Sequence, residues 1–245
     1  MILRHLSRSV RKQNWFDVVL EIVIVVVGIF IALQVDSWNS ERKERALENQ
    51  YLTRLHADMV GTLEDQHAND GWDRRQIDAQ EIVLRSLRSG ELKDQDRDLF
   101  GRGLMFLGAI NPRGLRWSTV EELKSTGNLT ILQSIELREL IGAVETSYQR
   151  WSQIIAGEEM VLTAHKIELQ KRFEATAYGL NYSEPTEIHY DFEELVTDRE
   201  LLNIISNAHA RSVLINEMRQ QHVQEVEMLR DELARLLASD KDQSR

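Results

Sequence analysis

The chain has 245 residues, a formal net charge of −10, two prolines and no cysteine. The lack of cysteine excludes a disulfide framework and any thiolate site, and the acidic excess, which lies after residue 35, argues against nucleic acid because phosphates would be repelled. Two prolines in so long a chain, Pro112 and Pro185, favour long uninterrupted helices, so the composition predicts an all-α protein.

Residues 1–14 form a basic N-terminal tail that contains four basic residues, Arg4, Arg8, Arg11 and Lys12. Two interpretations stay open for it. The tail could be a short amphipathic helix that lies on the lipid headgroups, or only a positively charged flank of the segment that follows.

The segment 18–35 is apolar at every position except Glu21, Gly28 and Gln34, and it lies between Trp15 and Trp38. As a helix with a rise of about 1.5 Å per residue, the distance between these tryptophans is roughly 34 Å, close to the thickness of a bilayer core. Indole rings prefer the two headgroup layers. The pattern predicts a transmembrane helix over residues 15–38, and its length and exit sequence favour an uncleaved signal anchor over a cleaved signal peptide.

One face of this predicted helix carries Glu21, Val25, Gly28 and Ala32. Gly28 and Ala32 form a pair of small residues four apart, which lets two helix backbones approach closely in lipid. We interpret the face as a possible helix-pairing surface, and a plain anchor is the alternative.

Basic residues are denser and closer to the apolar segment on its N-terminal side than on its C-terminal side. Because cytoplasmic flanks are enriched in lysine and arginine, we expect a single-pass inner-membrane protein with its N-terminus in the cytoplasm and its C-terminal domain outside. The bilayer is then the first partner.

Residues 39–238 are predicted to form a helical stalk and an extramembrane bundle with long antiparallel helices. The stalk should continue the transmembrane helix to about residue 68. The expected helices after it cover residues 72–87, 94–107, 118–126, 134–178 and about 198–238, with a linker at 179–189 and a disordered tail at 239–245. The sequence Ser118-Thr-Val-Glu121 predicts a capping box at the start of the short helix.

The last predicted helix carries a heptad pattern typical of a coiled-coil seam. Its positions are Leu201, Ile205, Ala208, Ser212, Ile215, Arg219, His222, Val226, Leu229, Leu233 and Leu236. Three of them are polar interruptions of the apolar pattern.

Three stretches resemble a family of uncharacterised bacterial single-pass membrane proteins, known only as a domain of unknown function. They are Glu21-x-x-x-Val25-x-x-Gly28-Ile-x-Ile31-Ala-Leu-Gln34-x-x-x-Trp38-Asn39, then Tyr51-Leu-x-x-Leu55-x-x-Asp58, and then Glu122-Leu-Lys-Ser-Thr-Gly127-Asn-Leu129. The resemblance implies a membrane location and a helical domain, without an activity.

The most suggestive local feature is the loop that carries Arg113 and Arg116 and opens onto a predicted helix start at Ser118. Two guanidinium groups and free N–H groups at a helix start could hold an anion. The alternative is an exposed turn whose Trp117 packs into the bundle. No metal, cofactor or nucleophile pattern reaches the required spacing, so we expect neither cofactors nor catalysis.

These observations lead to two functional hypotheses. The first is a membrane-anchored helical scaffold or interaction protein that binds a second copy of itself or an envelope protein through its bundle and heptad seam. The alternative is a sensor-like, ligand-binding ectodomain that acts through a partner.

Overall fold

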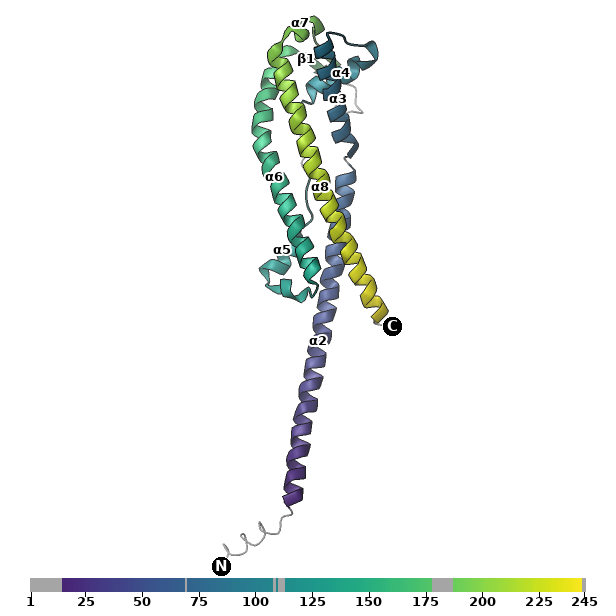
Figure 1. Ribbon diagram of the computed structural model, residues 1–245, viewed down its shortest axis with the longest axis vertical. Coiled ribbons are helices and arrows are strands. Elements are labelled where there is room, and N and C mark those ends of the chain that lie inside the picture. The colour runs from purple at the N-terminus through teal and green to yellow at the C-terminus, as the bar shows by residue number, and fades with distance from the viewer. Residues whose placement is uncertain (1–14, 69, 108, 110–112, 178–186, 244–245) are drawn as a thin grey trace, which may run out of the picture. The chain divides into compact units, whose positions relative to one another are not determined.

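The computed structural model describes residues 15–68, 70–107, 109, 113–177 and 187–243. The chain divides into two units, Met1–Tyr51 and Leu52–Arg245. In the first unit the described residues form one helix, α2 (Trp15–His67), whose last residues from Leu52 belong to the second unit (Figure 1).

The part of α2 from residue 20 to residue 47 has exposed side chains throughout. It includes large apolar residues such as Ile24 (63% exposed) and Phe30 (65%). By length and composition, one helix in the described part of the chain could cross a membrane, and it is this one. The expectation that the helix continues without interruption to about residue 68 is confirmed.

The second unit is a helical domain. Its helices are α3 (Asp70–Ser89), α4 (Arg97–Met105), α5 (Ser118–Ser125), α6 (Ile135–Leu169), α7 (Phe192–Thr197) and α8 (Arg199–Gln243), with short turns of 3-10 helix at Asp94–Asp96, Asn128–Ile131 and Gln170–Arg172. The all-α class is therefore confirmed.

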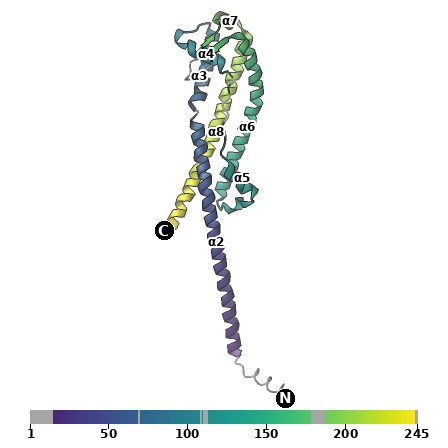
Figure 2. The ribbon, with the colours of Figure 1, turned by 180° about the vertical axis from the view of Figure 1, so that it is seen from behind.

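The two long helices α6 and α8 lie side by side in both views (Figures 1 and 2). Polar contacts between them follow an antiparallel register, in which the residue number rises on α6 as it falls on α8. Ser147 contacts His222, Glu158 contacts Arg211, and Arg172, just after α6, contacts Asp198 just before α8. Helix α3 packs along α8 as well.

The chain between α6 and α7 corrects one expectation. Helix α6 ends at Leu169 rather than near 178, and β1 (Glu174–Ala177) pairs antiparallel with β2 (Glu187–His189). The guanidinium of Arg172 donates to the carbonyl oxygen of Glu168 at 2.7 Å, which satisfies a carbonyl at the helix end. The predicted helix end at Gly179 and most of the predicted linker lie outside the described residues.

Helix α8 begins where the sequence predicts, because the Asp198 carboxylate accepts a hydrogen bond from the N–H of Leu201 at 2.9 Å. It ends later than predicted, at Gln243. Residues 239–243, part of the tail predicted to be disordered, are therefore helical. Neither glycine nor proline occurs between Ala238 and Gln243 to end the helix.

The heptad pattern of α8 marks the buried face of the domain. Buried along it are Leu201, Ile205, Ala208, Arg219, His222, Val226, Leu229 and Leu233. The face is apolar at both ends and polar in the middle. Because most of the seam packs inside its own domain, its buried positions are not available to a second copy or a partner.

Candidate functional site

The three residues of the predicted anion site do not converge. The Arg113 guanidinium is ion-paired with Asp73, at 2.6 Å between Nη2 and Oδ2, and its side chain is only 2% exposed. The Arg116 guanidinium pairs instead with Asp65 at 3.0 Å and is half exposed. The structure thus gives the two arginines different carboxylates.

Ser118 is exposed and makes no capping bond at the start of α5, so the predicted capping box is wrong. The carboxylate of Asp58, on α2, takes that role from a neighbouring helix. Its Oδ2 atom accepts from the Thr119 hydroxyl at 2.6 Å and from the Thr119 N–H at 3.4 Å. The protein's own carboxylate therefore lies where an external anion was predicted.

The predicted helix-pairing face of Glu21, Val25, Gly28 and Ala32 is exposed along its length. A methyl group added at Gly28 would meet no atom within 4 Å. Pairing through this face stays a prediction.

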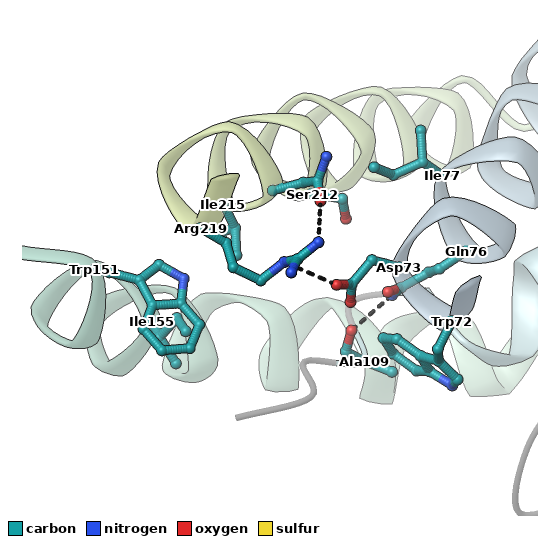
Figure 3. A pocket seen from close by; sticks show the side chains of 11 residues that line it. Trp72, Asp73, Gln76, Ile77, Ala109, Trp151, Ile155, Ser212, Ile215 and Arg219 are labelled. Atoms are coloured by element: carbon teal, nitrogen blue, oxygen red, sulfur yellow. Dashed lines mark hydrogen bonds and ion pairs between the residues drawn. The ribbon is translucent and has the colours of Figure 1, made fainter. Parts of the chain in front are cut away.

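A different cluster, which the sequence did not predict, lies in the polar middle of the domain. Asp73, near the start of α3, receives Arg113 from the loop before α5 and Arg219 from α8. The Arg219 Nε atom lies 3.1 Å from Asp73 Oδ2, and its side chain is 4% exposed (Figure 3). Two guanidinium groups thus share one carboxylate in a buried place, where charges are stable only when they are paired.

Neighbouring amides hold this cluster in position. The Gln76 side chain, one turn after Asp73, donates to the carbonyl oxygens of Phe106 and Ala109, which fixes the start of the loop that carries Arg113. On α8 the Asn216 side chain accepts from Arg219 at 3.3 Å. In the sequence, this cluster is indicated by Arg219, a cation at a heptad position where an apolar residue is expected.

A small cavity of about 30 Å³ adjoins Asp73 and Arg219. Its apolar and aromatic lining comes from Trp72, Ile77, Trp151, Ile155 and Ile215. Trp151 is 2% exposed, and its indole N–H is buried without a hydrogen-bond partner among the described residues. In Figure 3 the nitrogen-bearing edge of this indole faces the side of the cavity where the Arg219 side chain lies.

His222 lies behind Trp151, with the two rings nearly parallel and their centroids 6.2 Å apart. The Ser147 hydroxyl donates to the Val144 carbonyl oxygen, so its oxygen is left to accept from His222 Nδ1 at 2.9 Å. Burial lowers the pKa of His222 to about 4, and the ring is neutral near pH 7.

Both hydrogen-bond donors and acceptors line the cavity, among them the Arg219 guanidinium and the Asp73 carboxylate. In the described part of the chain, no group of three or more His, Asp or Glu side chains could hold a metal ion.

No protein-family model, no curated protein and no solved structure matches this chain.

Proposed function

We propose that this protein is a membrane-anchored helical interaction protein. The observation that carries the proposal is the exposed apolar part of α2. Large apolar side chains there are about half exposed or more, from Leu20 (47%) to Val35 (57%). Burying each such side chain contributes about 1.5–3 kcal/mol. A helical segment covered with them therefore strongly prefers lipid to water.

The proposed partner is a second copy of the chain, paired through Glu21, Val25, Gly28 and Ala32. Two observations support this choice over the heptad seam. The seam is already buried in its own domain, and the open space beside Gly28 leaves room for a neighbouring backbone. An envelope protein that docks on the domain is the alternative partner.

Membrane anchoring is tested with the full chain in bacterial membranes washed with alkaline carbonate. We expect the wild-type protein to stay in the pellet and the double variant Ile24→Lys/Val27→Lys to leave it, because a lysine near the centre of a span costs about 2.5–3.5 kcal/mol. The control is Ile135→Lys/Ile167→Lys, which changes two equally exposed isoleucines of the domain. Extraction of the wild-type chain would rule out the anchor.

Pairing is tested by the association of the full chain in detergent. Gly28→Ile should weaken self-association at least tenfold because the added side chain keeps the backbones apart, whereas Val27→Ile, which lies off this face, should leave association unchanged. Equal association of both variants would remove the pairing face. A reporter that is active only outside the cytoplasm, fused after Arg245, tests the proposed orientation.

A ligand-binding ectodomain is the second candidate function, and the cavity beside Trp151 is the observation that favours it. Its volume of about 30 Å³ is small, so only a small solute is a candidate ligand. A thermal shift with a small solute would favour this candidate, and self-association without any such shift would favour the first.

A further inference from the structure

We propose that the helical domain contains two cores that open separately, with a polar layer between them as the joint. The core at the α4 and α7 end opens while the core that contains the end of α2 stays folded. This conformational property goes beyond the proposed function, and it depends neither on membrane anchoring nor on a ligand in the cavity.

Buried apolar side chains at one end of the domain form a single cluster, which we call the upper core. It lies with α4 and α7 at the top of Figure 1. Its members come from residues 83–87 of α3, from 100–107 on and after α4, from Leu169 and Leu195, and from 201–208 of α8. This end of the domain therefore has a core of its own.

The remaining buried apolar side chains lie mostly on other segments. We call those at 55–63, 120–123, 137–144 and 223–233 the lower core, and each of them is at most 5% exposed. In the described part of the chain, none of these belongs to the upper cluster. Helix α8 thus contributes to both cores, with 201–208 in the upper one and 223–233 in the lower one.

Between these two segments of α8, the buried positions are polar. Arg219 is 3% exposed and His222 is fully buried. On α3 the fully buried Gln80 donates from Nε2 to the Ser212 hydroxyl at 3.2 Å, and its Oε1 atom is buried without a hydrogen-bond partner among the described residues. The polar layer consists of Asp73, Gln76, Gln80, Ser212, Arg219 and His222.

The polar layer joins the two cores weakly. Burial of apolar surface is the main force that makes two parts of a protein fold together, and cores separated by polar groups share little of it. Hydrogen bonds of the layer are exchanged for bonds to water on opening, and desolvation offsets the attraction within the ion pair of Asp73 and Arg219. The apolar Trp151 and Ile215 at this level adjoin the cavity of about 30 Å³, which further reduces contact.

The upper core is the one that opens first because short elements close it. Helices α4 and α7 have nine and six residues, and β1 and β2 form a two-stranded sheet. Such helices and hairpins are barely stable without tertiary contacts. The lower core is held by long helices, so the upper end is the movable part of the domain.

The test is hydrogen–deuterium exchange of the full chain in detergent, followed by mass spectrometry at urea concentrations below the unfolding midpoint. Residues 201–208 and 223–233 are compared because they lie on one helix. We expect the slowest amides at 201–208 to exchange at least tenfold faster than those at 223–233. Equal rates that respond alike to urea would show one cooperative domain and overturn the proposal.

Two core variants separate the cores. Phe100→Ala leaves a cavity in the upper core, so it should raise exchange rates at 201–208 at least a hundredfold and leave those at 223–233 within twofold. Leu229→Ala is the matched variant of the lower core and should show the reverse pattern. Acceleration of both segments by either variant would contradict the proposal. Phe100→Leu should give a smaller change of the same pattern if Phe100→Ala does not fold.

A third variant tests the polar layer as the joint. Gln80→Leu/Ser212→Ala replaces a hydrogen-bonded pair by apolar side chains and extends the apolar contact between α3 and α8. We expect exchange at 201–208 to slow at least threefold. Gln224→Leu changes an exposed glutamine of the same helix and should leave both segments unchanged. Unchanged or faster exchange at 201–208 in the double variant would mean that the layer is not the joint.

Discussion

Asp58 on α2 caps α5 from outside, with its Oδ2 atom 2.6 Å from the hydroxyl oxygen of Thr119. The same turn of α2 also holds the loop before α5, because the Thr62 hydroxyl accepts from the Arg116 N–H at 3.0 Å. The start of α5 is thus fixed by tertiary contacts and not by its own first residues.

Replacing Asp58 by alanine should lower the free energy of unfolding by about 1–2 kcal/mol, because a helix cap and a buried hydroxyl lose their acceptor together. Ser118→Ala should change it by less than about 0.5 kcal/mol, as expected for an exposed position. Chemical denaturation of both variants in detergent measures the difference. If Ser118→Ala proved the more damaging change, the local capping box would be restored.

Gly103 on α4 lies directly against α3. A Cβ atom added there would stand 2.6 Å from the carbonyl oxygen of Ala79 and 2.7 Å from the Cγ2 atom of Val83. Gly103→Ala should therefore destabilise the domain by about 1–3 kcal/mol, since backbone cannot move aside as a flexible side chain does. Gly142 is an exposed helical glycine with open space around it, so Gly142→Ala should stabilise by up to about 1 kcal/mol. An unchanged melting temperature in Gly103→Ala would show that α3 and α4 do not pack as described.

Asp73 is the carboxylate of the buried ionic cluster, so we expect its substitution to lower the stability of the domain more than substitution of an exposed acidic residue. Asp73→Asn should destabilise the domain by about 3–5 kcal/mol, because it removes the carboxylate that two buried guanidinium groups share. The comparison is Asp65→Asn, which weakens the half-exposed pair with Arg116 and should cost less than about 1 kcal/mol. Equal losses in urea denaturation would argue that the cluster is open to water.

The stability of the domain should fall when the pH is lowered through the range in which unfolded histidine titrates. The folded pKa of His222 is about 4 and the unfolded value is about 6.5, so the unfolded chain takes up a proton first. The loss therefore begins near pH 6.5 and is complete near pH 4, with a maximum of about 3 kcal/mol from this residue.

Among the described residues, the Ser147 hydroxyl and the rings of Tyr148 and Trp151 contact the His222 ring. The variant His222→Phe keeps a ring in the stack and should show a flatter dependence of stability on pH between 7 and 5. His67→Gln changes an exposed histidine and should keep the wild-type slope. A slope that is the same in all three proteins would assign the acid sensitivity to other groups.

Elements with a local signal could be predicted from the amino-acid sequence. The apolar run after Trp15, the heptad pattern of α8 and the start of α8 near Asp198 follow from periodicity and from residues within a few positions of each other. The all-α class followed from the same patterns. The end of α6 was missed because strand pairing depends on Ala175 meeting Ile188, a contact across a gap in sequence that periodicity does not report.

The partners of the polar side chains, in contrast, depend on how the helices pack. Arg113 was read with Arg116 because the two are neighbours in sequence, yet its partner Asp73 lies 40 residues away, and Arg219 reaches the same carboxylate from the last helix. The carboxylate at the start of α5 also comes from another helix, through Asp58. Charged and capping side chains select partners by distance in space, and that distance is set by how α3, α6 and α8 pack rather than by any one segment.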